Sequence, residues 1–407
     1  MSPVTTSGYD IAAVRSCFPA LAGGTAFFDG PGGSQVPEAV GDAVRATLVG
    51  PISNRGQVTA AERRADDVVL GARRAVGDLL GADPRGVVFG RSMTALTFDL
   101  ARTLARTWSA GDEVVVSRLD HDANVRPWVL AAEAVGATVR WIDFDPVSTE
   151  LTPADVAAVL GARTRLVAVT GASNLVGTRP DLPAIADLVH TAGALLFVDG
   201  VHLTAHTGVD LAATGADVYV CSPYKFLGPH CGVLAAAPAL LESLRPHKLL
   251  PSTDQVPERY ELGTLPYELL AGTTAAVDFL ADLAGTGGER RARLTESMAA
   301  VEEHEDRLRS RLEEGLRALP GLTIWSRAAR RTPTLLLTFE GRDPVGAYTF
   351  LAARGVNAPA GTFYAYEPAR RLGLAEQGGL RVGLAPYTDD EDVDRLLAGL
   401  ADFLAAG

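Results

Sequence analysis

The chain has 407 residues, 47% of them hydrophobic and 21% charged, which is typical of a globular enzyme large enough to form two lobes. Its net charge of −12 argues against a nucleic-acid partner, because proteins that bind phosphate backbones need a basic face. No apolar run is long enough for a membrane span, and the first residues lack the basic start of a signal peptide, so we expect neither membrane association nor export.

From about residue 86 to 237, short apolar runs rich in β-formers alternate with helical patterns. Runs that are apolar on both faces belong inside a sheet covered by helices, which predicts an α/β fold with a mostly parallel seven-stranded sheet. One intervening helix is expected at "TPADVAAVLGA", where Thr152 precedes Pro153. The predicted strands are "GVVFG", "EVVVSRLD", "TVRWIDFD", "RLVAVTGAS", "LLFVDGVH", "DVYVCSPYK" and "CGVLAAA".

The pattern changes near "PERYELGTLP", at residues 257–266. A long charged helix is predicted over 289–319, followed by strands near "LTIW", "TLLLTF" and "LRVGLA" and a closing helix from "DDEDVDRLL". The apolar residues that keep helical spacing in the long helix are Leu294, Met298, Val301, Leu308 and Leu312. We therefore predict a large domain over 26–262, a small α+β domain over 263–407, and an arm over 1–25 that joins the small domain.

Polar side chains follow several of the predicted strands at the point where each strand ends. Ligands of open α/β sheets lie beyond the carboxyl ends of the strands, so these side chains are candidates for one shared site. They are Ser92 and Thr94 after the first run, His121 and Asn124 after the second, Asn174 after the fourth, Asp199 and His202 after the fifth, and Ser222 and Lys225 after the sixth.

Each of these residues also has an ordinary structural interpretation. Asp199 is either a helix cap or a carboxylate that pairs with a protonated ring nitrogen, as in pyridoxal phosphate chemistry. Lys225 is either a solvated charge or an amine whose pKa is lowered for Schiff-base formation. His121 is either a residue at a helix start or a ring that stacks on a planar cofactor. Ser92 and Thr94 open a helix, where they either cap it or hold a phosphate.

Competing motifs are absent or incomplete. No P-loop and no GxSxG elbow occur, and "GTGG" near residue 285 does not follow a strand. His202 and His206 have the spacing of two zinc ligands, but no third ligand is evident, so no metal site is expected. Cys17, Cys221 and Cys231 form neither a CxxC pair nor a disulfide framework, which favours a cytoplasmic location.

Several motifs in a fixed order resemble those of fold-type I pyridoxal phosphate enzymes, in the cysteine desulfurase-like branch of the class V aminotransferases. The resemblance covers nearly the whole chain, and its motifs are "FFDGPGGSQVP", "NRG", "HDANVRPW", "GASNLVG", "VDGVH", "SPYKFLGP", "ELGT" and "LRVGLAPYTDDEDVDRLL". It implies that pyridoxal 5'-phosphate is the cofactor and that the protein is a homodimer with shared active sites.

The resemblance also implies a role for each matching residue. Lys225 would form the Schiff-base link, Asp199 would pair with the pyridine nitrogen, and His121 would stack on the ring. Arg381 would bind the substrate carboxylate as a bidentate donor. The other cofactor contacts implied are Asn174 and His202 at the phenolic oxygen, Ser92, Met93, Thr94, Ser222 and Tyr224 around the phosphate, and Thr264 at the phosphate of a neighbouring subunit. The substrate contacts implied are Asn54, Arg55, Phe363 and Tyr364.

One departure from the family pattern bears on the reaction. Desulfurases carry a nucleophilic cysteine on the loop before the arginine strand, because a thiolate must take up the sulfur. Here that loop, "AGTFYAYEPARRLGLAEQGGLRVG", contains no cysteine, and Tyr364 falls near the expected position. Cys231 is near Lys225 in sequence, but it begins a strand, so we expect it to be buried and inert.

The leading hypothesis is therefore a pyridoxal phosphate enzyme that breaks the C–S bond of an S-substituted cysteine by α,β-elimination, with Lys225 as the base at Cα. The alternatives with the same cofactor are an aminotransferase, an epimerase or a decarboxylation-linked deaminase in a biosynthetic pathway, with Phe363, Tyr364 and Tyr366 as walls for a bulky substrate. An alternative of another class is a non-catalytic scaffold that kept the fold.

Overall fold

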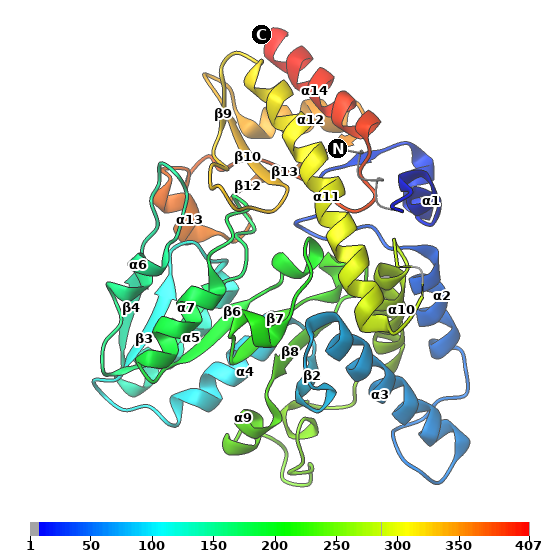
Figure 1. Cartoon of the computed structure of the whole chain (residues 1–407), viewed down its shortest axis with the longest axis vertical. Coiled ribbons are helices and arrows are strands. Elements are labelled where there is room, and N and C mark those ends of the chain that lie inside the picture. The colour runs from blue at the N-terminus through cyan, green and yellow to red at the C-terminus, as the bar shows by residue number, and fades with distance from the viewer. Residues whose placement is uncertain (1–7, 286, 407) are drawn as a thin grey trace, which may run out of the picture.

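A central seven-stranded sheet forms the larger lobe of the computed structural model, which describes residues 8–285 and 287–406 (Figure 1). The strands lie in the order β2-β8-β7-β6-β5-β3-β4, and only β8 runs antiparallel to its neighbours. Each of the seven predicted runs forms one strand, and the mostly parallel sheet is confirmed. The strands are β2 (Val87–Gly90), β3 (Glu113–Ser117), β4 (Thr138–Ile142), β5 (Thr164–Thr170), β6 (Leu195–Asp199), β7 (Val218–Cys221) and β8 (Gly232–Ala236).

Helices cover both faces of this sheet, and the packing of β3 explains why its three central residues are all valine. Val115 packs into the core that contains α3 and α7, whereas Val114 and Val116 pack into the core that contains α4 and α5. Successive side chains of a strand point to opposite faces, so a strand buried on both faces needs apolar residues at every position. The helices of this lobe are α2 (Glu38–Leu48), α3 (Ala60–Leu80), α4 (Met93–Ala105), α5 (Arg126–Val135), α6 (Pro153–Ala157), α7 (Leu182–Thr191), α8 (Leu211–Thr214), α9 (Pro238–Ser243) and α10 (Tyr267–Ala281).

The smaller lobe is built on an antiparallel sheet in the order β12-β13-β10-β9. Three of its strands match the predicted runs, and the fourth, β12, is only two residues long. The closing helix α14 begins after Asp389, which forms a capping box with Asp392. The elements are β9 (Leu322–Ile324), β10 (Thr334–Phe339), α12 (Pro344–Ala352), β12 (Ala360–Gly361), α13 (Tyr366–Arg371), β13 (Gly379–Gly383) and α14 (Asp390–Ala405).

The lobes exchange segments at both predicted domain boundaries. Helix α10, assigned to the small domain from the sequence, packs against α2 and α3 and buries Leu270 and Val277 in the core of the larger lobe. Strand β1 (Ala26–Phe27), assigned to the large domain, pairs in parallel with β11 (Val356–Asn357) of the smaller lobe. Of the predicted arm, α1 (Ile11–Ser16) contacts the smaller lobe, while residues 1–7 lie outside the described residues. The change of sequence pattern near residue 262 marks a loop and not a change of packing partner.

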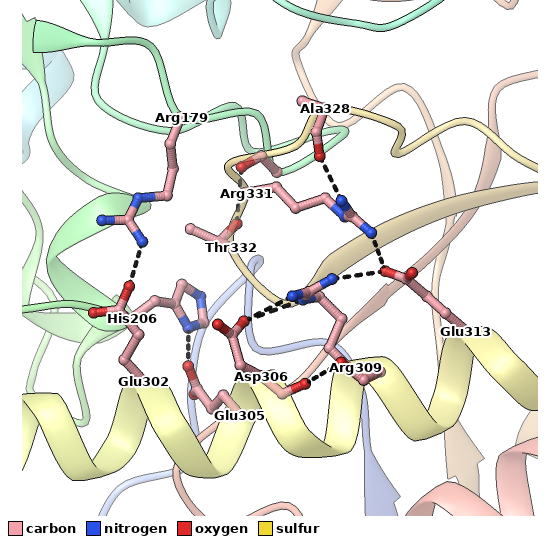
Figure 2. A network of polar contacts seen from close by, with 12 residues as sticks. Arg179, His206, Glu302, Glu305, Asp306, Arg309, Glu313, Ala328, Arg331 and Thr332 are labelled. Carbon is pink, nitrogen blue, oxygen red and sulfur yellow. Dashed lines mark hydrogen bonds and ion pairs between the residues drawn. The ribbon is translucent and has the colours of Figure 1, made fainter.

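Helix α11 (Arg290–Arg317) spans both lobes, and the five apolar residues predicted to face inward are all buried. Its first half contributes to the core of the larger lobe and its second half to that of the smaller lobe. Polar contacts along its length bind it to both lobes: Glu302 and Glu305 bind Arg179 and His206 of the larger lobe, and Glu313 binds Arg331 of the smaller lobe as well as Arg309 of the helix itself (Figure 2). None of the helices in the described part of the chain combines the length and apolarity needed to cross a membrane.

Candidate active site

Two adjoining cavities open at the carboxyl ends of the sheet strands, between the lobes. The inner cavity collects all the strand-end residues singled out from the sequence except Asn124. Asn124 is instead held in the protein interior, where its amide donates to Asp120 at 2.6 Å and accepts from the Trp128 indole at 3.1 Å. The predicted residues lining the inner cavity are Ser92, Met93, Thr94, His121, Asn174, Asp199, His202, Ser222, Tyr224 and Lys225.

Lys225 follows β7 in a short 3-10 turn and extends its amine between the two lobes. Its Nζ donates to the backbone carbonyl of Pro31. The pKa of Lys225 is lowered to about 7. Burial is the main cause and the Arg381 charge adds to it, while the Asp199 carboxylate opposes the shift. A large part of the population is therefore the neutral amine at pH 7, which is the form that attacks a carbonyl. This environment differs from that of a solvated surface lysine.

Asp199 is the last residue of β6 and is buried below the cavity. Its Oδ1 accepts the N–H of Val201 at 3.0 Å, and burial raises its pKa to about 6 against the opposing effects of that bond and of Lys225. Only glycine fits at position 200, directly after Asp199, because a Cβ there would lie 1.8 Å from the Tyr219 ring. A buried carboxyl of this kind is suited to pair with a cationic ring nitrogen.

His121 caps a short 3-10 turn after β3, with Nδ1 accepting the N–H of Ala123 at 3.0 Å. Burial lowers its pKa to about 4, and the charges of Lys225 and Arg381 add to this effect, so the ring is neutral at pH 7. The Tyr364 ring lies beside it, with 5.6 Å between the centroids and an angle of 33° between the planes. His121 thus caps a turn and also lines the inner cavity, and its stacking on a cofactor ring stays a prediction.

The first turn of α4 closes the inner cavity with polar groups. Ser92 is the N-cap, and its Oγ accepts the N–H of Ala95 at 3.1 Å. Gly232 of β8 allows the strand to approach closely, because a Cβ there would lie 2.3 Å from the Met93 nitrogen. Together with Thr94 and Ser222, which also line the cavity, this helix start provides amides and hydroxyls of the kind that bind phosphate.

Arg381, on β13 of the smaller lobe, lines the outer cavity, as His121 does. Its Nη1 donates to the Asn174 carbonyl at 3.0 Å, and the guanidinium carbon lies 3.7 Å from the centroid of the Phe363 ring. Burial lowers its pKa to about 9, although the Asp29 carboxylate opposes the shift. The buried Nε has no hydrogen-bond partner among the described residues, so the guanidinium keeps a donor for a carboxylate ligand.

The unpaired buried atoms and the donor set of the inner cavity fit pyridoxal phosphate. Asn174 donates from Nδ2 to the Phe363 carbonyl at 3.0 Å, but its buried Oδ1 lacks a partner within the described chain. His202 Nε2 lies 3.0 and 2.9 Å from the hydroxyls of Thr332 and Thr334, which leaves its other ring nitrogen for a ligand. One amine, one buried carboxyl, a neutral histidine face and a hydroxyl-lined helix start match the aldehyde, ring nitrogen, ring face and phosphate of this cofactor.

Three predicted site residues lie away from both cavities of their own chain. Arg55 does not face the substrate site, because its guanidinium binds Asp66 at 2.6 Å and Glu258 at 3.0 Å. Asn54 is exposed next to it. Thr264 is also exposed, and its predicted contact with a neighbouring subunit stays a prediction.

The outer cavity, of about 560 Å³, contains residues that the sequence reasoning missed. Arg126 is the first residue of α5 and stands in the motif "HDANVRPW", but it lies beyond the turn that follows β3, so the strand-end rule that found His121 did not reach it. Phe98 lies four residues after Thr94 on the same helix, a spacing that places both on one face. Pro31 and Gly32 come from the N-terminal segment, and only the tertiary fold brings them to the site.

None of the residues lining the two cavities within the described chain is a cysteine. Cys231 is buried and its Sγ lies 3.5 Å from the Thr273 hydroxyl. Burial raises its pKa to about 11 and also raises the pKa of Cys221, so neither supplies a thiolate at neutral pH. Tyr364 instead occupies the edge of the outer cavity, with 78% of its surface exposed.

Comparisons with known proteins agree with this geometry. The Aminotransferase class-V family model matches residues 26–396. Uncharacterized protein MT3887 of Mycobacterium tuberculosis is 34% identical, over 97% of this chain and 99% of its own length. Aminotransferase-like protein FGM3 of Gibberella zeae is 32% identical, over 98% and 99%. The solved structure of the cysteine desulfurase CsdA, in its S-sulfonic acid form, from Escherichia coli superposes with a TM-score of 0.86 at 27% identity, covering 98% of this chain and 99% of that one.

Proposed function

Since the chain belongs to the aminotransferase class-V family, we propose that it is a lyase that cleaves the C–S bond of an S-substituted, cysteine-like amino acid. It is a pyridoxal phosphate-dependent enzyme of the cysteine desulfurase-like type. The observation that carries the proposal is that the two cavities, which gather the predicted cofactor and carboxylate residues Lys225, Asp199 and Arg381, contain no cysteine in their lining over the described residues.

Each part of the proposed reaction has a residue suited to it. The bound cofactor supplies an electron sink that weakens the bonds at the substrate Cα. Arg381 binds and orients the α-carboxylate, and Lys225, neutral near pH 7, takes the proton from Cα. Asp199 keeps a positive charge on the ring nitrogen stable, since it is a buried carboxylate with few other partners.

The leaving group follows from the missing thiol. A desulfurase needs a thiolate to accept sulfur from free cysteine, whereas the sulfur of an S-substituted cysteine leaves as an ordinary thiolate, RS⁻, when the Cβ–S bond breaks. The thiolate takes up one proton, and the released enamine reacts with water to give pyruvate and ammonium. The products therefore balance as thiol, pyruvate and ammonium from the amino acid and one water.

The test is a product assay of the holoenzyme with S-methyl-L-cysteine while the cofactor spectrum is followed in the same cuvette. Methanethiol and pyruvate in equal amounts, with the original spectrum restored when the substrate is used up, support the lyase. Formation of alanine from L-cysteine, with its sulfur passed to an added thiol as a persulfide, in the absence of any thiol release from S-methyl-L-cysteine overturns the proposal in favour of a desulfurase that uses an external acceptor.

Transamination is the second candidate, because a relative that is 32% identical over nearly the whole chain is named aminotransferase-like. Accumulation of the pyridoxamine form of the cofactor, reversed by a keto acid, favours this reaction over the lyase. Epimerisation is detected as a change in the chirality of the recovered amino acid, whose composition stays the same. Decarboxylation-linked deamination is detected as the release of carbon dioxide. A protein that takes up no cofactor revives the scaffold alternative.

A further inference from the structure

The outer cavity concentrates positive charge on a chain that is acidic overall. Its lining includes two arginines, Arg126 and Arg381, and the partly neutral amine of Lys225, against one acidic side chain, Asp122. The whole chain has 49 acidic and 37 basic side chains, so this balance is the reverse of the average. A cavity with that excess favours an anionic ligand. Lys225 and Arg381 have the tasks described above, which leaves Arg126 without a role.

Arg126 is held in place only weakly by its own chain. Its Nη2 lies 3.3 Å from Asp122 Oδ1, in a pair four residues apart whose side chains are 40% and 31% exposed. Exposed pairs of this kind contribute little to stability. The other N–H groups of its guanidinium make no hydrogen bond to any described residue. Arg55, by contrast, is bound by two carboxylates at 3.0 Å or less.

Three aromatic side chains also line the outer cavity. Phe98 lines it from α4, and Phe363 and Tyr364 line it from the loop before β13. Two hydrogen bonds hold the backbone of this loop. Asn174 Nδ2 donates to the backbone carbonyl of Phe363 at 3.0 Å, and the N–H of Asp122 donates to the backbone carbonyl of Tyr364 at 2.8 Å. A cavity of about 560 Å³ with such walls is far larger than an S-methyl group requires.

We propose that the S-substituent of the natural substrate is aromatic and carries an anionic group that Arg126 binds, while Arg381 binds the α-carboxylate. The substrate then has two anionic ends, one recognised by the buried guanidinium and one by the half-exposed guanidinium. This inference rests on the proposed C–S lyase activity for the nature of the bond cleaved, but the recognition itself does not depend on which bond breaks.

The test compares S-benzyl-L-cysteine with S-(4-carboxybenzyl)-L-cysteine, which differ by one carboxylate. The holoenzyme is expected to prefer the carboxylated substrate by about tenfold in kcat/KM, mainly through KM, because a charge-assisted contact at a half-exposed site has roughly that strength. Arg126→Gln is expected to abolish the preference and leave turnover of S-benzyl-L-cysteine within about twofold. Arg126→Glu is expected to reverse it in favour of S-(4-aminomethylbenzyl)-L-cysteine.

Arg102→Gln is the matched control, because Arg102 is a similarly exposed arginine paired with a nearby aspartate, Asp99, on α4, and it lines neither cavity. It is expected to keep the wild-type preference. Equal kcat/KM values for the two benzyl substrates in the wild type, or a preference that survives Arg126→Gln, overturn the inference.

A binding measurement separates this inference from the proposed reaction. Calorimetric titration of the holoenzyme with the non-cleavable analogues in which CH₂ replaces sulfur is expected to give the same tenfold difference and the same response to Arg126→Gln. Discrimination in binding without any thiol release refutes the lyase and leaves the recognition intact. Thiol release from S-methyl-L-cysteine without discrimination in binding refutes the recognition and leaves the lyase intact.

Discussion

Lys225 has an environment that changes its chemistry, and the sign of each influence is known. Burial and the Arg381 charge favour the neutral amine, and the Asp199 carboxylate favours the charged form. The rate of cofactor uptake by the apoprotein is therefore expected to rise with pH and to level off just above pH 7, since the neutral amine is the nucleophile. A lysine with an ordinary pKa would give a rate that still rises beyond pH 9.

Two variants move this profile in opposite directions. Arg381→Gln removes a repelling cation and is expected to shift the profile to higher pH, whereas Asp199→Asn removes an attracting anion and is expected to shift it to lower pH. Stopped-flow absorbance of the bound cofactor measures both. Shifts in the same direction would contradict the assignment of the two charges.

Phe363 and Tyr364 have φ angles of +55° and +57°, in a region that residues with a Cβ rarely adopt. Tyr364 is largely exposed, so its side chain adds little packing that offsets the strain. Tyr364→Gly is expected to be about 1 kcal/mol more stable than Tyr364→Ala, because only glycine relieves the left-handed conformation. Urea unfolding measures the difference, and the alanine variant controls for loss of the ring. Equal stabilities would show that the backbone here is not strained.

At the scale of elements, the ion pairs of α11 tie this helix to both lobes: Glu302 and Glu305 bind Arg179 and His206 of the larger lobe, and Glu313 binds Arg331 from the loop before β10 (Figure 2). Glu313 also accepts from two arginines of the same helix, Arg309 at 3.0 Å and Arg317 at 2.7 Å. Burial raises the pKa of Glu313, but the hydrogen bonds and charges of Arg331 and Arg309 outweigh burial and lower it below its usual value. The carboxylate thus stabilises the fold in its charged form.

Glu313→Gln is expected to lower the free energy of unfolding by about 2 kcal/mol at pH 7, because three arginines lose their anionic partner. The folded-state pKa is depressed, so this contribution is complete above the ordinary pKa of glutamate and is lost as the pH falls below it. Chemical denaturation at pH 7 and near pH 3.5 tests this, with exposed Glu314→Gln as the control. A gap between wild type and Glu313→Gln that is unchanged at low pH would contradict it.

The sequence predicts a strand or helix well where the spacing of its apolar residues is regular over the whole element. Most of the seven sheet strands were found because they are apolar on both faces, and Asp199 and Lys225 stand at or just after the ends of β6 and β7. Strands β1 and β11 were missed because two residues carry no periodicity. Helix α10 was assigned to the wrong lobe because its partners α2 and α3 lie some 200 residues earlier in the chain.

The same limit applies to the site. His121, Asn174 and Ser222 follow strands, so the topology alone collects them. Arg55 was predicted to bind substrate because it matches a motif, but its partner Glu258 is distant in sequence, and no local pattern reveals that ion pair. Arg126 was visible in a motif and was passed over, because only the cavity identifies it as a lining residue.

For the whole molecule, a homodimer remains the prediction. Three exposed leucines, Leu249, Leu250 and Leu262, lie in the segment that links α9 to α10 and that also contains Thr264. Exposed apolar side chains gathered in one segment are typical of an interface. Sedimentation is expected to give twice the chain mass of 42.6 kDa, and Leu250→Asp is expected to give monomers.

Val147→Asp is the control for this experiment, because Val147 is also an exposed apolar residue and lies in the loop after β4, far along the chain from this segment. It is expected to leave the dimer intact. Wild-type protein that sediments as a monomer, or a Leu250→Asp variant that stays dimeric, would contradict an interface at this segment.

The pairing of β1 with β11 has a consequence for how the protein is made. Residues 26 and 27 leave the ribosome early, but the strand they pair with, and Asp389 and Asp392, which bind Arg15, are synthesised more than 320 residues later. The smaller lobe therefore cannot be completed until β11 and these aspartates have been synthesised, and its first segment must wait for them. At about 5–20 residues per second, that delay lasts tens of seconds, during which the larger lobe has time to fold first.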